Sequence, residues 1–181
     1  MRPERRVFPD APAARDEVER LCRRFDEGLG VWARRLIYVL MLPDRELLLR
    51  YNNQGVPRWE DRLLRRAFGP ATDGVKRVLD IRPGVEVQDE ADVWREFDAV
   101  AGLLADGRPY LCGERFSAAD LAFTALSSPV VAPPGYGVVL PQPDEMAPRT
   151  ADVIRRAREH PAGRFALATY ATQRDARTAV A

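Results

Sequence analysis

The chain has 181 residues, of which 46% are hydrophobic and 30% charged, with a formal net charge of +1. This length fits one domain, and the hydrophobic content can fill a core, which excludes a disordered chain. The near-neutral charge argues against a nucleic-acid partner, which normally binds a basic excess.

The cysteine content and the hydropathy pattern narrow the class of protein further. Two cysteines, Cys22 and Cys112, are too few for a disulfide framework. The first residues do not form a signal peptide, and no apolar run is long enough to cross a bilayer. We therefore expect a cytoplasmic protein with no membrane partner.

Residues 1–9 form a basic lead that contains prolines, and residues 10–181 are predicted to form a single helical domain. Asp10 is the expected N-cap of the first helix. One face of this helix carries apolar side chains at helical spacing: Val18, Leu21, Cys22, Phe25 and Leu29. Beyond Gly28 and Gly30, which can shift the helical phase, the other faces also become apolar, through Val31, Ile37, Tyr38, Met41 and Leu42.

The stretch from Pro43 to Pro83 predicts three further helical segments. The first spans 45–51, and a turn rich in Asn, Gly and Pro follows it. The second spans 58–68 and is kinked or ended by Gly69-Pro70, and the third spans 72–81. The basic face of the second segment is interleaved with acidic residues, which favours an ordinary solvated surface.

Apolar spacing predicts the next helix over 89–105, and the strongest helix start in the chain follows it. Ser117 is an expected N-cap, and Asp120 stands at the position that completes a capping box. Phe116 and Leu121 occupy the two positions of a hydrophobic staple. The helix is apolar nearly all round, which indicates burial, and Pro129 is expected to end it.

The remaining chain predicts a long Pro- and Gly-rich loop over 130–148 and a helix from Thr150. One more helix is expected beyond Ala162. Only residues 137–140 have the character of an extended segment, so the expected fold class is all-α. His160 is the single histidine and has no cluster of Cys or carboxylates nearby in the sequence, so no metal site is predicted.

Residues 106–122, DGRPYLCGERFSAADLA, resemble the signature of the C-terminal helical domain of glutathione transferases. In that family, an apolar helix leads into a turn of this kind, which starts a central capped helix. Glu114 replaces the more usual Asp. The resemblance implies a helical bundle in which region 43–83 is an elaboration. It also implies that residues 1–9 correspond to the segment that joins the family's thioredoxin-like half to its helical half.

This resemblance implies a wall for a hydrophobic electrophile site and a contribution to dimerisation. By resemblance, the ligand-facing candidates on the first long helix are Val31, Arg34, Arg35 and Tyr38. The alternative is that these side chains pack on later helices of the chain or on a second subunit. The thioredoxin-like half is missing, so the chain is expected to contain no catalytic residue, to hold no cofactor and to be unable to activate glutathione alone.

The implied partners are a second copy in a homodimer or a thioredoxin-like N-terminal half, which would supply glutathione as co-substrate. An apolar small molecule is the implied ligand. The alternative function is a non-catalytic scaffold or protein-interaction module that buries a face around Trp32, Trp59 or Trp94. No carboxylate pair, Ser–His–Asp set or phosphate-binding loop points to an unrelated enzyme.

Overall fold

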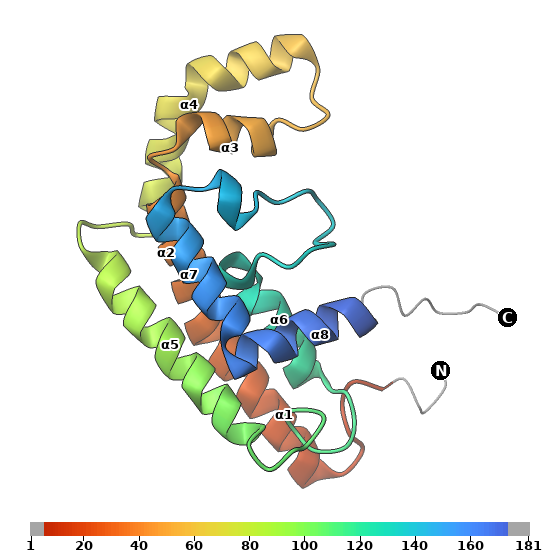
Figure 1. The fold of residues 1–181 in the computed structure, drawn as a ribbon. Helices are drawn as coiled ribbons and strands as arrows, with labels where there is room; N and C mark the ends of the chain where they lie inside the picture. Colours follow the sequence, from red (N-terminus) through yellow and green to blue (C-terminus); the bar gives the residue numbers. More distant parts are fainter. Residues whose placement is uncertain (1–5, 174–181) are drawn as a thin grey trace, which may run out of the picture.

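The structure, a computed structural model, describes residues 6–173, and all regular elements in this range are helical (Figure 1). In chain order they are α1 (Pro12–Arg24), η2 (Phe25–Leu29), α2 (Gly30–Met41), α3 (Arg45–Asn52), α4 (Arg58–Val78), α5 (Val85–Leu103), α6 (Ala118–Val131), η3 (Pro143–Glu145), α7 (Pro148–Glu159) and α8 (Pro161–Gln173). The predicted all-α class is confirmed for these residues, and residues 137–140 form no strand. None of the described helices combines the length and the apolar character that spanning a membrane requires.

Helix α6 lies at the centre of the bundle, in contact with α1, η2, α2, α7 and α8, while α5 runs along α2 (Figure 1). Three aromatic rings pack together where α6, η2 and α5 meet. The Phe123 ring of α6 lies 5.4 Å from that of Phe25 in η2 and 5.7 Å from that of Phe97 in α5, measured between centroids. All three side chains are fully buried. This tilted, edge-on packing is the arrangement that aromatic quadrupoles favour.

The first long helix is continuous from α1 through α2, with one π-helical turn, η2, between them. The backbone N–H of Gly30 donates to the Phe25 carbonyl five residues earlier, which inserts one extra residue into the helix. A Cβ on Gly28 would come within 2.8 Å of Trp32, and a Cβ on Gly30 within 2.8 Å of Leu126. The two glycines therefore allow Trp32 and Leu126 to pack closely against the helix backbone. The extra residue of the π turn produces the phase shift that the sequence predicts at these glycines.

The expected cap at Asp10 is wrong. The N-cap of α1 is Ala11, which makes no side-chain capping bond, because Pro12 opens the helix. The Asp10 carboxylate instead pairs with Arg6 at 2.5 Å. The lead has a different attachment: the Val7 carbonyl accepts a 2.8 Å hydrogen bond from the Ala118 N–H at the start of α6. The proposed boundary between residues 1–9 and 10–181 stays a prediction.

The N-terminus of α6 forms the predicted capping box between Ser117 and Asp120. Asp120 is fully buried, and its carboxylate accepts hydrogen bonds of 2.7 Å from the Ser117 N–H, the Ser117 hydroxyl and the Leu111 N–H. Phe116 stacks edge-on against Tyr110, and Leu121 is 53% exposed. The staple between Phe116 and Leu121 stays a prediction, and the helix is less completely buried than its composition indicates.

Pro129 does not end α6 as expected, because the helix continues to Val131 with the proline inside it. Proline has no N–H to donate to the carbonyl of Ala125, four residues earlier. The Ser128 hydroxyl supplies the missing donor, at 2.7 Å from that carbonyl oxygen. The helix ends after Val131, where the C-cap residue Ala132 adopts the left-handed conformation with φ of 45°.

Helices α3 and α4 form an arm at one end of the bundle (Figure 1). Asp44 caps α3 by accepting a 3.1 Å hydrogen bond from the Leu47 N–H. Of the two outcomes expected at Gly69-Pro70, the end of the helix is wrong, since α4 runs unbroken from Arg58 to Val78 with Pro70 inside it. Figure 1 shows that α4 is bent, and a proline inside a helix is a common cause of such a bend. None of the 21 residues of α4 is buried.

Helices α7 and α8 meet at a sharp corner (Figure 1), and His160 is the residue between them. Helix α7 starts at Pro148, two residues before the expected Thr150. His160 Nδ1 accepts a 3.3 Å hydrogen bond from the Ala162 N–H, and Nε2 lies 3.1 Å from an Asp98 carboxylate oxygen. A Cβ on Gly163 would come within 1.7 Å of the Ala157 carbonyl oxygen, so only glycine fits this corner. The part of the expected tail over 174–181 lies outside the described residues.

Candidate functional site

A pocket of about 340 Å³ opens between α2, α3 and the loop that follows α6. We call it the α2–α3 pocket. Its lining residues are Arg34, Ile37, Tyr38 and Met41 from α2, Leu48, Tyr51 and Asn52 from α3, Ser128, Pro129 and Ala132 at the end of α6, Tyr136, Val138, Val139, Leu140, Pro141 and Met146 from the loop, and Ile154 from α7. The lining is mainly apolar, with a few polar groups, which is the usual make-up of a small-molecule site.

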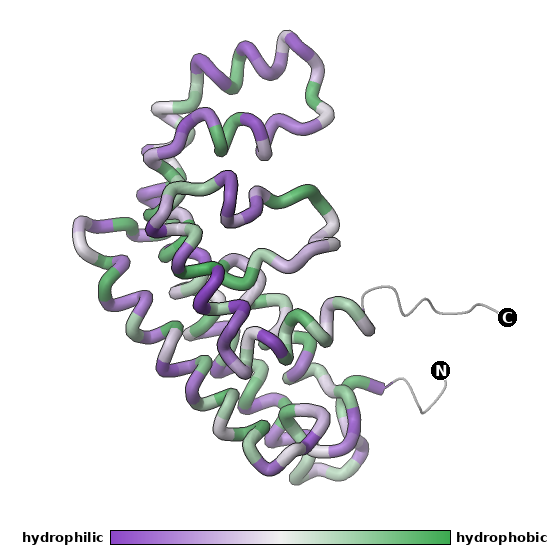
Figure 2. The backbone as a smooth tube through the Cα atoms, viewed as in Figure 1, coloured by the Kyte–Doolittle hydropathy of each residue, from purple (hydrophilic) through white to green (hydrophobic). Residues whose placement is uncertain are grey.

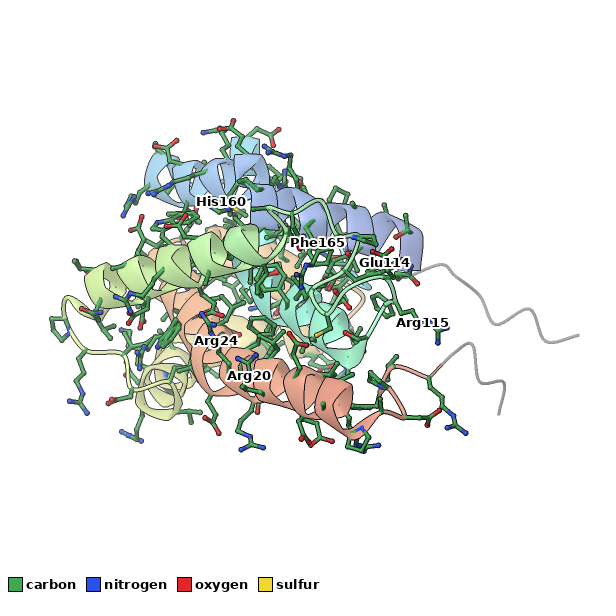
Figure 3. All side chains as sticks on the ribbon, turned by 90° about the horizontal axis from the view of Figure 1, so that it is seen from below. Arg20, Arg24, Glu114, Arg115, His160 and Phe165 are labelled. Atoms are coloured by element: carbon green, nitrogen blue, oxygen red, sulfur yellow. The ribbon has the colours of Figure 1, made fainter. Side chains whose placement is uncertain are left out.

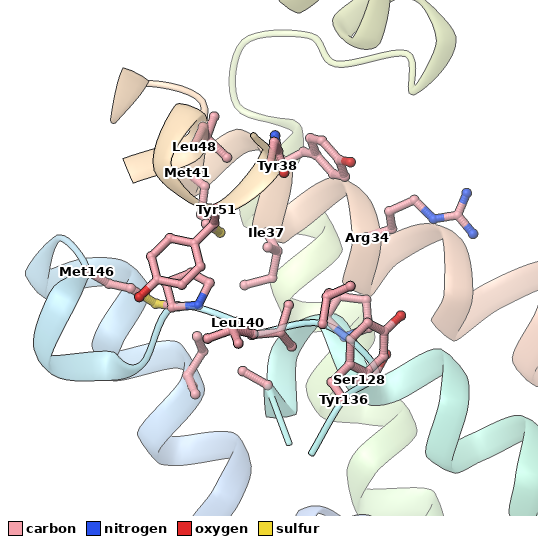
Figure 4. Close-up of a pocket in the computed structure, with 17 residues that line it drawn as sticks. Arg34, Ile37, Tyr38, Met41, Leu48, Tyr51, Ser128, Tyr136, Leu140 and Met146 are labelled. Atoms are coloured by element: carbon pink, nitrogen blue, oxygen red, sulfur yellow. The ribbon is translucent and has the colours of Figure 1, made fainter. Parts of the chain in front are cut away.

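The aromatic side chains stand on opposite sides of this pocket (Figure 4). Tyr51 lies beside Met146 on one side, and Tyr136 lies beside Ser128 on the other, with Ile37 between them. Arg34 stands at the edge of the pocket, and its guanidinium is directed outward from the cavity. It is exposed, and no carboxylate of the described residues lies within 4 Å of it. An unpaired cation therefore borders an apolar cavity.

The structure divides the four ligand-facing candidates into two groups. Arg34 and Tyr38, four residues apart on α2, both line the pocket. Val31 is 45% exposed and does not line it. Arg35 points to α5, where its guanidinium donates to both Asp89 oxygens at 2.6 and 2.7 Å. For Arg35, the alternative that it packs on a later helix of the chain is confirmed.

The loop after α6 is tied to α3 beside the pocket. The Tyr51 hydroxyl lies 2.6 Å from each Glu145 carboxylate oxygen and donates to this carboxylate, and the Gln142 N–H donates to it at 3.1 Å. Gln54 Nε2 also donates to the Val139 carbonyl at 3.3 Å. The Tyr51 hydrogen bond is the main cause that lowers the pKa of Glu145, and the same bond raises the pKa of Tyr51. We call the Tyr51–Glu145 contact the α3 latch.

Ser117 and Cys112, two side chains of nucleophilic type, lie outside this pocket, whereas Ser128 lines it with its hydroxyl hydrogen-bonded to the Ala125 carbonyl. Ser117 is buried and bound to Asp120 in the α6 cap, which confirms the structural role predicted for both residues. Burial raises the pKa of the Cys112 thiol to about 11, so this cysteine is almost entirely protonated at neutral pH. Among residues 6–173, no group of three His, Cys, Asp or Glu side chains is placed to hold a metal ion.

Sequence reasoning missed the half of the pocket contributed by α3 and the loop. Tyr51, Tyr136 and Met146 line the site but stand far from α2 in the sequence. No local pattern joins them to Tyr38, because the contact depends on how the loop folds back over α3. The sequence identified this segment only as a Pro- and Gly-rich loop over 130–148.

Comparison with protein-family models, with curated proteins and with solved structures gave no match to this chain. The resemblance to glutathione transferases therefore depends on the residues that carry it, chiefly the turn and cap over 106–122.

Proposed function

We propose that the chain binds an apolar small molecule in the α2–α3 pocket. The observation that carries this proposal is the apolar cavity itself, whose volume of about 340 Å³ is within the range of ligand pockets. Arg34 at the edge and the hydroxyls of Tyr38 and Tyr136 offer polar contacts to one end of such a molecule. A flat aromatic compound with one polar or anionic group fits this arrangement best.

The proposal agrees with what the resemblance to glutathione transferases implies. In that reading, α2 forms the wall of a hydrophobic electrophile site, and a thioredoxin-like half supplies glutathione. The chain would then contribute binding but not activation of the thiol. Mixing it with glutathione and an aryl halide is expected to give no turnover above the uncatalysed rate, and clear turnover would contradict this part of the proposal.

Binding can be tested by titration calorimetry with 1-naphthol and 1-naphthoate. Leu140→Gln places a polar group in the pocket wall and is expected to weaken binding of both compounds about tenfold. Arg34→Gln is expected to weaken naphthoate binding more than naphthol binding, because it removes only the cation. Val31→Gln is the matched control on α2, exposed and outside the pocket lining. Equal effects of the pocket and control variants would contradict the proposal.

A second candidate function, the protein-interaction module, is favoured by the exposure of one tryptophan. Of the three tryptophans, Trp94 is 8% exposed and packs against Phe97, and Trp32 is half-buried against Gly28. Trp59 on α4 is 67% exposed. Only this tryptophan is available to a partner, so a Trp59→Gln variant that leaves every complex of the chain intact would remove this candidate.

A further inference from the structure

The first half of α4, before Pro70, carries large apolar side chains that no described residue covers. Trp59 and Leu63 are 67% and 57% exposed. The helix is held to the arm mainly from its other side, where Arg45 lies over the Phe68 ring and donates to the Arg65 carbonyl at 2.8 Å. Trp59 and Leu63 are four residues apart and form one row along the helix.

A row of arginines runs directly beside this apolar row. This row has an arginine every four residues: Arg58, Arg62 and Arg66. Each of these arginines directly precedes Trp59 or Leu63 or follows one of them by three residues, so the two rows are neighbours on the helix. All three are exposed, and among the described residues no carboxylate lies within 4 Å of them. Arg65 differs, because it pairs with Asp61 at 2.9 Å and with Glu46 at 3.1 Å. We call Arg58, Trp59, Arg62, Leu63 and Arg66 the α4 surface.

The acidic residues of this half-helix offset the charge of the α4 surface only in part. Glu60 follows Trp59 by one residue, which turns it about 100° away around the helix, whereas Asp61 lies three residues after Arg58, on the neighbouring face. Asp61 is occupied by Asn53 at 2.7 Å and by Arg65. The arginine row therefore keeps its positive charge beside exposed apolar groups.

This combination limits what can cover the surface. Two copies of α4 packed together would bring like-charged arginine rows next to each other, which disfavours a second copy. None of its residues lines the α2–α3 pocket, and hydrophilic and hydrophobic residues alternate along this helix (Figure 2). An amphipathic helix with arginines beside Trp and Leu is instead suited to lie in the interface of a bilayer.

We propose that the α4 surface docks the protein on a bilayer that contains anionic lipids. Trp59 and Leu63 enter the boundary between headgroups and acyl chains, and Arg58, Arg62 and Arg66 contact lipid phosphates and carboxylates. A helix that lies on a bilayer does not have to be long or apolar enough to span it. This proposal departs from the expectation of no membrane partner and is independent of the α2–α3 pocket.

The test is flotation of the full chain with vesicles of phosphatidylcholine alone and of phosphatidylcholine mixed with phosphatidylserine. The chain is expected to float with the mixed vesicles and to be released by salt, which screens the arginines. Arg62→Gln/Arg66→Gln is expected to lower the partition coefficient by about tenfold or more. Trp59→Gln is expected to reduce it as well and to remove the blue shift of tryptophan emission that accompanies binding.

The control is Arg20→Gln/Arg23→Gln, which removes the same charge from exposed positions on α1, where Arg20 is visible in Figure 3. This variant is expected to bind the mixed vesicles like the unaltered chain. Circular dichroism of each variant verifies that the helices are retained. Flotation with neither vesicle, equal flotation with both, or an equal loss in the control variant would overturn the proposal. So would a dimer in solution that Trp59→Gln dissociates, because a second copy would then occupy the surface.

Discussion

The guanidinium of Arg35 and the carboxylate of Asp89 form two parallel hydrogen bonds, of 2.6 and 2.7 Å, that join α2 to α5. Asp89 is 1% exposed, and Arg35 is the cation paired with it. The hydrogen bond to Asp89 is also the main cause that raises the pKa of Arg35. Removing one member of such a pair leaves the other buried without compensation.

Arg35→Gln is therefore expected to lower the free energy of unfolding by about 3 kcal/mol. Urea denaturation measures this change. Glu19→Gln, which breaks the exposed Arg15–Glu19 pair on α1, is the matched control and is expected to cost less than about 1 kcal/mol. Similar losses for both variants would show that the Arg35–Asp89 pair has no special role.

The start of α6 should be the most sensitive capping site of the chain. Asp120→Ala removes the acceptor of three hydrogen bonds and leaves the buried Leu111 N–H without a partner, so a loss of about 3 kcal/mol or more is expected. Ser117→Ala removes one side-chain cap and is expected to cost about 1 kcal/mol. Thermal unfolding of the two variants tests the order, and a larger loss for Ser117→Ala would contradict this account.

This cap was predictable because its chemistry is local: Ser117 and Asp120 are three residues apart. The Arg35–Asp89 pair spans 54 positions, and nothing in the local pattern of α2 separates Arg35 from Arg34. The π turn at η2 decides whether Arg34 or Arg35 faces α5. In the sequence, only the two glycines, Gly28 and Gly30, indicate that the helix changes phase there. The all-α class followed from helix signals throughout the chain, whereas the pocket depended on a loop that folds back over α3.

Ser128 and Pro129 should behave as a coupled pair. Ser128→Ala leaves the Ala125 carbonyl without its hydroxyl donor and is expected to cost about 1 kcal/mol. In a Pro129→Ala background the restored backbone N–H can serve the same carbonyl, so Ser128→Ala is expected to cost less there. A double-mutant cycle in urea measures this difference. Additive effects would mean that Ser128 does not compensate for the proline.

Glu96 should make the chain less stable as the pH rises. Burial raises the pKa of Glu96 above its ordinary value, and the Arg24 Nε hydrogen bond of 3.1 Å to one oxygen offsets this only in part. The other oxygen, Oε1, is buried and lies 2.9 Å from the same Arg24 Nε but accepts no hydrogen bond from the described residues. A group whose pKa is raised by folding stabilises the fold below its unfolded pKa, and this stabilisation is lost as the pH rises through the folded pKa.

Glu96→Gln has no such titration, so its stability relative to the unaltered chain is expected to increase between pH 4 and pH 7. Urea denaturation at both pH values measures the two differences. The comparison between pH values isolates the titration of Glu96 from the lost Arg24 contact, which affects both measurements. A difference that does not change with pH would contradict the raised pKa.

The α3 latch should weaken at both ends of the pH range, because both of its side chains titrate. The lowered pKa of Glu145 means that the latch stabilises the loop above the ordinary glutamate pKa and that this stabilisation is lost as the pH falls through the lowered value. The raised pKa of Tyr51 means that the contribution is present below the ordinary tyrosine pKa of about 10 and is lost as the pH rises through the raised value. Between these limits the loop is fastened beside the pocket.

NMR titration of ring-labelled tyrosine measures the pKa of Tyr51 directly. In Glu145→Gln this pKa is expected to fall towards its ordinary value, because the charged acceptor is gone. Arg50→Gln is the matched control, since it removes the cation 3.4 Å from Glu145 but keeps the Tyr51 hydrogen bond. The pKa of Tyr51 is therefore expected to stay raised in this control. If Glu145→Gln left the Tyr51 pKa unchanged, the two side chains would not be in contact, and the loop would be held by its other hydrogen bonds, such as Gln54–Val139 and Arg158–Gln142.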